Sequence, residues 1–372
     1  MQVVKTLFIS AMLMVPFLKS FASSLEDSAS VGFNAYADTG DVQVYSPTFS
    51  LMKTLSKNFL VGFKMRVDAI AAASITNGGN PVTADAVAGA SGQEGFGDVR
   101  YAPTLIMAYD DGANAVSGGY YYSTENDYVG QAVFLNYVRQ LNEDNTAIGI
   151  GFSQSFDEWD PVFKRDLPRS DRKERKIDLS VNQLISPTFS MQLVYSYLYS
   201  EGFLSSPYHY VLQDSFAKFE NYPEQRTGHA FAIKGVNLLN AANSINYGYR
   251  YYQDDWDIKS HTLNIEWLHD LDPHWMLGLR GRYYTQSAAS FSKDVGGYSV
   301  SDTYFATDYR MSAFDSYDIG IPLIYKPSVN SPYKVSASVD YYRTSDNDYI
   351  KNWYDVNALE AVYTTLRVDY KF

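Results

Sequence analysis

The sequence predicts an all-β protein, a transmembrane antiparallel β-barrel of about 16 strands, with about 14 as the other allowed count. Apolar and polar residues alternate strictly over segments of about ten residues, as in strands with one face in lipid and the other in water. Tyrosine recurs near the ends of the apolar faces, at the depth of lipid headgroups. A soluble periplasmic β-sandwich or propeller is the alternative, since its strands alternate in the same way.

The last segment of the chain shows the alternation most clearly. Its apolar face contains Val362, Leu366 and Val368, and its polar face contains Arg367 and Asp369. The same strand ends in Tyr370 and Phe372, which resemble the carboxy-terminal signal that the barrel-insertion machinery of Gram-negative bacteria reads. We therefore expect that machinery to be a partner.

The remaining strands are expected wherever the pattern recurs. The expected segments are 29–37, 42–55, 59–72, 96–109, 113–124, 127–141, 146–158, 175–186, 189–201, 226–239, 244–256, 257–271, 275–289, 312–326, 333–345 and 358–372. The connections at one end are tight and rich in turn residues. The other end has the loops 73–95, 159–174, 202–225 and 290–311, and the shorter 346–357. This segregation is typical of outer-membrane barrels with periplasmic turns and extracellular loops.

The amino terminus predicts export. Lys5 precedes an apolar run from Leu7 to Leu18, and Ser20-Phe21-Ala22 supplies small residues for cleavage. The run is about a dozen residues long, too short for a spanning helix. We expect a signal peptide over residues 1–22 and a barrel over 23–372, located in the cell outer membrane.

Composition excludes several classes of protein. The 372 residues contain no cysteine, which rules out disulfide scaffolds, thiolate metal sites and cysteine nucleophiles. The net charge of −12 argues against nucleic acid as a partner. Neither a phosphate-binding loop nor a dinucleotide fingerprint is present, so no cofactor is expected.

Charged residues on the expected inner face predict a hydrated lumen. Arg250, Arg280 and Arg282 lie on strands close in sequence, with Glu266 between them, an arrangement that would form a basic stripe facing an acid. The favoured alternative is that such charges only pair across adjacent strands and solvate the lumen. The other residues expected to face inward are Lys64, Arg66, Asp68, Asp178, Asn182, Asn246, Asn264, Gln286, Asp340, Arg367 and Asp369.

The expected loops leave three questions open. Loop 73–95 either folds inward as a constriction or covers the mouth. Loop 159–174 and its edge are basic, so they either pair with lipopolysaccharide phosphates or stay solvated. Asp254, Asp255 and Asp257, and likewise Asp346 and Asp348, either hold a divalent cation or form hydrated hairpin tips; the lack of calcium-loop spacing favours hairpin tips.

Catalysis is not expected. Ser260, His261 and Asp257 form the one cluster that resembles a nucleophile–base–acid set. Neighbours on a strand point to opposite faces, so Ser260 and His261 are poorly placed to share a proton.

Several local motifs resemble a bacterial outer-membrane β-barrel family of unknown function. They are Glu220-Asn221-Tyr222-Pro223 with Arg226, Tyr249-Arg250-Tyr251-Tyr252, Asp254-Asp255-Trp256, Ser260-His261-Thr262, and Arg282-Tyr283-Tyr284 with Gln286-Ser287-Ala288-Ala289. The resemblance is densest over 220–291 and assigns no substrate. It implies two further partners, a periplasmic thioredoxin-like protein and a small lipoprotein, which are often encoded near members of the family.

The same motifs have structural interpretations. Asn221-Tyr222-Pro223 before Arg226 is suited to fixing the end of a long loop against the next strand. Tyr249, Tyr251 and Tyr283 fit an outer aromatic girdle. Arg250, Arg282, Tyr284 and Gln286 fit a network in the lumen below it, which we expect to be the functional region.

Two functions are expected from these features. The first is a channel-like protein that passes polar or charged solutes through a hydrated lumen. The second is a non-catalytic conduit or anchor in an envelope export or assembly system with periplasmic partners.

Overall fold

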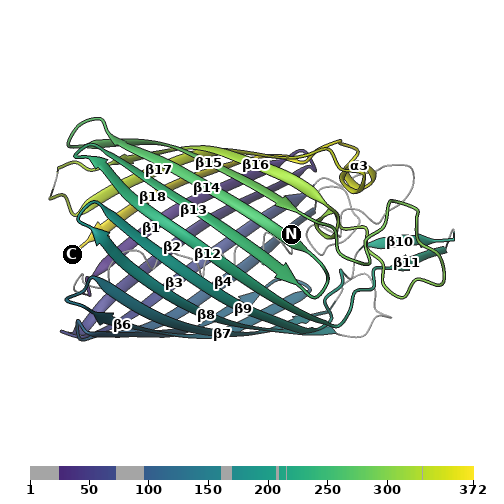
Figure 1. The fold of residues 1–372 in the computed structure, drawn as a ribbon, viewed down its shortest axis with the longest axis horizontal. Helices are drawn as coiled ribbons and strands as arrows, with labels where there is room; N and C mark the ends of the chain where they lie inside the picture. Colours follow the sequence, from purple (N-terminus) through teal and green to yellow (C-terminus); the bar gives the residue numbers. More distant parts are fainter. Residues whose placement is uncertain (1–24, 73–95, 161–169, 207–208, 215, 329) are drawn as a thin grey trace.

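A computed structural model describes residues 25–72, 96–160, 170–206, 209–214, 216–328 and 330–372. Sixteen antiparallel strands form one closed barrel (Figure 1). The first nine are β1 (Ser28–Asp38), β2 (Val42–Ser56), β3 (Phe59–Ala72), β4 (Phe96–Asp110), β5 (Asn114–Thr124), β6 (Tyr128–Leu141), β7 (Thr146–Trp159), β8 (Ser170–Ser186) and β9 (Phe189–Gly202). The other seven are β12 (Gln225–Asn240), β13 (Asn243–Asp254), β14 (Lys259–Asp270), β15 (Trp275–Gln286), β16 (Phe314–Tyr325), β17 (Tyr333–Thr344) and β18 (Glu360–Lys371).

The predicted barrel and its count of 16 strands are confirmed, and most strand ends fall within a few residues of the expected ones. The largest difference at a strand start is in β8, which begins at Ser170 instead of residue 175. Arg172 and Lys173 are therefore strand residues with opposite orientations, because neighbours along a strand alternate. The predicted basic loop is correspondingly shorter than expected.

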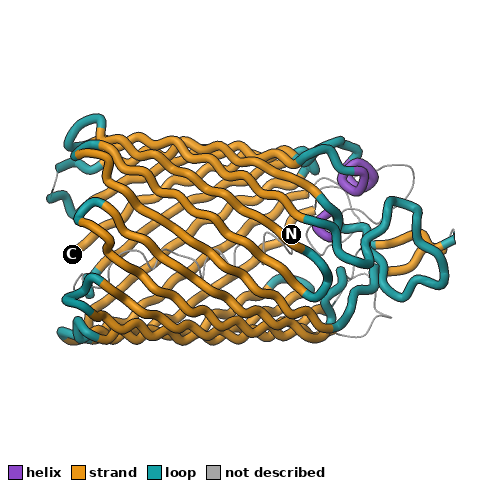
Figure 2. The backbone as a smooth tube through the Cα atoms, viewed as in Figure 1, coloured by secondary structure: helices purple, strands orange, loops and turns teal. Residues whose placement is uncertain are grey.

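The two ends of the barrel differ as predicted (Figure 2). We call one end the turn end, because very short connections join β2 to β3 and β8 to β9 there. The start of β1 and the end of β18 also lie at the turn end. The opposite end, here the loop end, includes the long segments 203–224, 287–313 and 345–359. The predicted signal peptide and loop 73–95 lie outside the described residues, as does 161–169.

Short elements within the long segments were not predicted. They are the hairpin of β10 (Tyr210–Gln213) and β11 (Phe216–Phe219), the 3₁₀ turn η1 (Tyr309–Met311) and the helix α3 (Asp348–Tyr354). Asn347 caps α3 by accepting from the backbone N–H groups of Tyr349 and Ile350. Among the described residues, no helix is long and apolar enough to span a membrane.

The outer and inner faces of the barrel have opposite chemistry. On the outer face Ile265, Leu279 and Ile321 are each more than half exposed. On the inner face Gln192 and Ser196 are buried between their neighbours. An exposed apolar band around a closed sheet is the surface that a bilayer covers.

This polarity predicts opposite outcomes for two neighbouring substitutions on β14. Ile265→Arg places a charge against acyl chains and should reduce the unfolding free energy by about 2–4 kcal/mol in a bilayer. Asn264→Arg places the same charge in the lumen and should change the unfolding free energy by much less. Urea titration in lipid vesicles measures both, and equal destabilisation of the two variants would contradict the assigned faces.

Candidate lumen site and its cap

The long segments 203–224, 287–313 and 345–359 fold together over the loop end, and we call their described parts the cap. Figure 1 shows the β10–β11 hairpin extending beyond the barrel, with α3 beside the rim. Two apolar clusters hold the cap together. One joins Tyr222, Ala289, Ala306 and Met311 of the cap to Trp256 and Ile258 of the β13–β14 connection, and the other consists of Val211, Tyr298 and Phe305. The cap is therefore a folded unit and not a set of independent loops.

Glu220 joins two of the three cap segments. Its Oε1 accepts from the backbone N–H groups of Thr307 at 2.5 Å and Asp308 at 2.9 Å. Its Oε2 accepts from the Tyr222 hydroxyl at 2.7 Å. Burial, reinforced by the charge of Glu220, raises the pKa of Tyr222 far above its ordinary value, so the phenol remains a donor. A buried carboxylate with this many donors fixes segment 203–224 against 287–313.

The third cap segment is attached through aromatic and apolar contacts. Trp353 of α3 stacks on the ring of His209, with 5.0 Å between centroids. Tyr354, at the end of α3, packs against Val42, which faces the lumen at the start of β2 and is also in contact with Tyr36 of β1. The cap thus contacts the barrel interior as well as the rim.

An ion pair lies inside the cap. The Arg310 Nε donates to Asp308 Oδ1 at 2.6 Å. Burial opposes the charge on Asp308, but the neighbouring Arg310 guanidinium outweighs it and lowers the pKa of the carboxyl to about 2. The pair therefore remains ionised over the physiological pH range.

Two predicted lumen residues hold the cap from below. The Gln286 side-chain amide donates to the carbonyl oxygens of Arg310 at 2.8 Å and Ser312 at 2.7 Å. The Tyr284 hydroxyl donates to the Gln286 Oε1 at 2.6 Å. The alternation identified the inward direction of both side chains, but it contained no information on this contact with the cap.

The Arg226 motif also supports the loop end. Arg226 donates twice to Asp254 Oδ2, and its guanidinium carbon lies 4.6 Å from the centre of the Trp256 ring. Asp254 Oδ1 accepts from the backbone N–H groups of Trp256 and Ile258, both at 3.0 Å. These contacts leave Asp254 as a hairpin-forming residue, consistent with the favoured interpretation of this aspartate cluster.

Below the cap, tyrosines on several strands face the lumen. They include Tyr36 of β1, Tyr252 of β13, Tyr284 of β15, Tyr342 of β17 and Tyr363 of β18. The ring centroids of Tyr36 and Tyr363 are 4.8 Å apart. Tyr249 and Tyr283, in contrast, lie on the outer face and are 41% and 48% exposed. The expected girdle and the inner tyrosines therefore occupy opposite sides of the same strands.

The predicted basic stripe divides into paired and open residues. Arg280 donates twice to Asp340, at 2.5 Å each, and the pair crosses over Gly320 of the intervening strand. A Cβ at position 320 would lie only 2.7 Å from Arg280 Nε, so glycine makes room for this bridge. Glu266 accepts from Asn246 at 2.8 Å. For Arg280 and Glu266, pairing across strands is the arrangement observed.

Arg250 and Arg282 have no hydrogen bond or ion pair to any of the described residues. Arg250 lies over the Tyr252 ring at 5.2 Å, and its Nε is buried without a hydrogen-bond partner. Arg282 is exposed to the lumen. The two guanidinium groups repel one another. They are the open cations of the predicted network.

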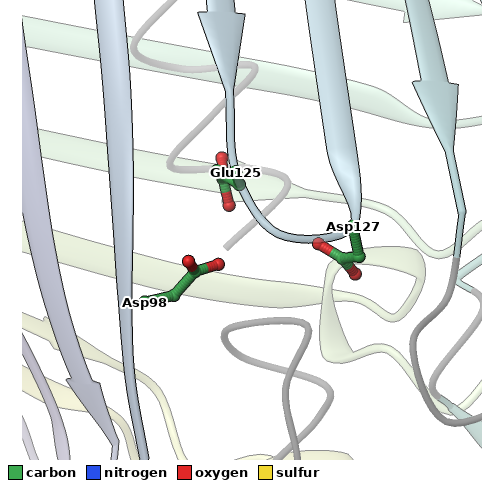
Figure 3. A group of neighbouring side chains, drawn as sticks. All are labelled: Asp98, Glu125 and Asp127. Atoms are coloured by element: carbon green, nitrogen blue, oxygen red, sulfur yellow. The ribbon is translucent and has the colours of Figure 1, made fainter.

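Three carboxylates that the sequence did not suggest as a group lie near the loop end (Figure 3). Asp98 of β4 faces Glu125 and Asp127 of the β5–β6 connection, and their oxygens lie within 4.8 Å of one another. Arg100 Nη1 is 4.0 Å from Glu125, which supplies compensating charge. Carboxylates are the ligands that hard cations prefer, although exposed acidic groups are also common without one.

The Ser260–His261 pair is separated by the sheet. Ser260 is 2% exposed and faces inward, whereas His261 is on the outer face and bonds to the Tyr249 hydroxyl at 2.7 Å. The two side chains therefore cannot share a proton directly.

The fold and this site define an outer-membrane-type β-barrel with a lumen lined by ionisable residues and with a folded cap. Residues 5–363 match the family described as "Protein of unknown function (DUF3570)", and the chain belongs to that family. No curated protein matches the sequence.

Solved structures of outer-membrane proteins resemble the fold. A structure titled "Bacterial polysaccharide outer membrane secretin" has a TM-score of 0.54 at 9% identity, with 94% of this chain and 99% of that chain covered. The CymD monoaromatic hydrocarbon channel has a TM-score of 0.47 at 8% identity, covering 98% and 92%. The outer membrane channel DcaP of Acinetobacter baumannii has a TM-score of 0.42 at 10% identity, with 93% of this chain and 96% of that chain covered. At such identities the similarity concerns the fold alone.

Replacing Glu220 should loosen the cap and leave the barrel intact. Glu220→Ala removes the acceptor for the Thr307, Asp308 and Tyr222 donors, so trypsin should cut the cap at Lys293 or Arg310 several-fold faster. Glu360→Ala, at an exposed rim pair with Arg343, is the matched control. Unchanged cap proteolysis in Glu220→Ala would contradict the assigned role.

Acid should weaken the cap through Asp308. Its pKa is lowered from 3.8 to about 2 in the folded protein, so its stabilising effect is complete above pH 4 and is lost as the pH falls toward 2. Tryptophan fluorescence should report this change, since Trp256 and Trp353 lie in or against the cap. In the Asp308→Asn variant, the fluorescence change that this carboxylate causes between pH 4 and pH 2 should be absent. A transition of the same amplitude in both proteins would exclude Asp308 as the titrating group.

Proposed function

We propose that the protein is a channel of the outer membrane that passes polar or charged solutes through its hydrated lumen, with the cap restricting entry. The observation that supports this most directly is the open pair of arginines, Arg250 and Arg282, inside a barrel whose outer face is apolar. Ionised side chains require water or a counter-ion. A barrel of 16 strands has room for a water-filled lumen.

The proposed orientation follows the loop lengths. The turn end faces the periplasm and the cap faces outward, as in other outer-membrane barrels. Tyr370 and Phe372 stack at 5.8 Å at the turn end, where we propose that the insertion machinery reads them. Outward-facing Lys173 and Arg175 at the loop end are the proposed contacts for lipopolysaccharide phosphates.

A second candidate function is a closed, non-catalytic conduit or anchor with periplasmic partners. The cap favours this candidate, because its three segments are tied to one another and to Gln286 across the loop end. A periplasmic thioredoxin-like protein and a small lipoprotein are the proposed partners. Neither candidate assigns a catalytic role to any residue.

Planar bilayers distinguish these candidates. Purified full-length protein should produce stable conductance steps if it is a channel, and Glu220→Ala should raise the open fraction by loosening the cap. A barrel that remains silent in both forms would contradict the channel and support the anchor.

The lumen cations should set ion preference. Replacing Arg250, Arg280 and Arg282 together with serine should move the reversal potential in a salt gradient toward cation selectivity. Arg343→Ser, on the outer face of the rim, should leave it unchanged. Reversal potentials that do not differ between the triple variant and the parent would remove these arginines as selectivity determinants.

A further inference from the structure

We propose that Arg250, Asn264 and Arg282 form a binding subsite in the lumen for a hydroxylated organic acid, such as an acidic sugar. This inference rests on the proposed function in one respect, that solute reaches the lumen. It adds the chemical class of the solute and distinguishes the residues that bind it from those that only pair internally.

The three residues lie together on neighbouring strands. Gly248 of β13, Asn264 of β14 and Arg282 of β15 are directly opposite one another in the sheet register. Arg250 occupies the next inward position on β13 and has Thr262 opposite it. Asn264 and Arg282 are both exposed, and neither has a hydrogen bond to the described part of the chain.

A glycine faces the lumen opposite Asn264. Gly248 has no side chain of its own, and a Cβ there would make ordinary contact with Lys234 Cγ at 3.5 Å. The Lys234 side chain therefore lies beside this position, and the subsite is bordered by a lysine as well as by the two arginines.

The charges favour an anionic group at this point. Two guanidinium groups repel one another without a bridging acid, and the buried Arg250 Nε has no hydrogen-bond partner. A carboxylate between them would relieve the repulsion and accept from both, and guanidinium groups bind carboxylates in a two-point geometry. Asp178 attracts Arg250 but forms its ion pair with Lys176, at 2.8 Å, and its Oδ1 accepts from Ser196.

The neighbouring polar groups favour hydroxyls on the same ligand. Asp318 of β16 is opposite Arg282 in the register and attracts it, although their side chains do not form an ion pair within 4.0 Å. Its carboxylate can accept from a hydroxyl, and the Asn264 amide can donate or accept. Because Asp318 would repel a bare anion, the arrangement suits a carboxylate that also carries hydroxyl donors.

Arg280 provides a matched control from the same strand. It faces the lumen two residues from Arg282, but Asp340 already occupies its guanidinium in a two-point bridge. If net positive charge alone attracted the ligand, Arg280 would contribute as much as Arg282. If the open donors bind it, Arg280 would contribute little.

Titration calorimetry of the full-length protein in detergent tests the subsite with three probes: glucuronate, glucose and acetate. Glucuronate should bind more tightly than either of the others, which lack the carboxylate or the hydroxyls. Arg250→Gln and Arg282→Gln should each weaken glucuronate binding by about tenfold or more, and Arg280→Gln by much less. Asp318→Asn should weaken glucuronate while improving acetate.

Equal binding of glucuronate and glucose, an equal loss in Arg280→Gln, or no glucuronate binding at all would overturn the subsite. Acetate binding as tight as glucuronate would reduce the site to an anion site and overturn the requirement for hydroxyls. Because calorimetry needs no conductance, a conducting barrel without glucuronate binding removes the subsite and retains the channel. If the protein binds glucuronate but conducts no ions in bilayers, the subsite is retained and the channel is removed.

Discussion

Closure of the sheet is the constraint on which the rest of this structure depends. A strand in a bilayer has no water to satisfy its backbone N–H and C=O groups, so every edge must be paired. Here β1 pairs with β18 from Ser28↔Lys371 to Asp38↔Ala361, which joins the two ends of the chain. Once the sheet is closed, every strand has one face in lipid and one in the lumen. The alternation of side chains then separates the apolar outer face from the ionisable inner one.

The cap represents a second, independent solution to the burial of polar groups. Its backbone does not form a ladder with the barrel, so donors such as the N–H groups of Thr307 and Asp308 need other acceptors. Glu220 is the acceptor for both of these N–H groups. Gln286, on the barrel, donates to the carbonyl oxygens of Arg310 and Ser312 in the cap. The same two residues also determine how segments 203–224 and 287–313 are arranged over the mouth.

The barrel was predictable from sequence because its determinants are local. Period-two alternation and tight turns depend on neighbouring residues, so the strands and the segregation of the loops follow from them. The cap was not predictable in this way, since Glu220 and Thr307 are far apart in sequence and their segments have no periodicity. The motif around Glu220-Asn221-Tyr222 marked the region without revealing its partners. In the lumen, the alternation oriented Arg280 and Arg282 inward, but it could not show that Asp340 reaches Arg280 across Gly320 while Arg282 stays open.

The central claim is that the open arginines face water inside a lipid-facing cylinder. The absence of native cysteine allows a direct test by single cysteine substitution. In protein inserted in vesicles, Arg282→Cys should react readily with a small water-soluble thiol reagent, while Leu279→Cys on the outer face of the same strand should be protected by acyl chains. Protection of position 282, or faster labelling at 279 than at 282, would contradict the account.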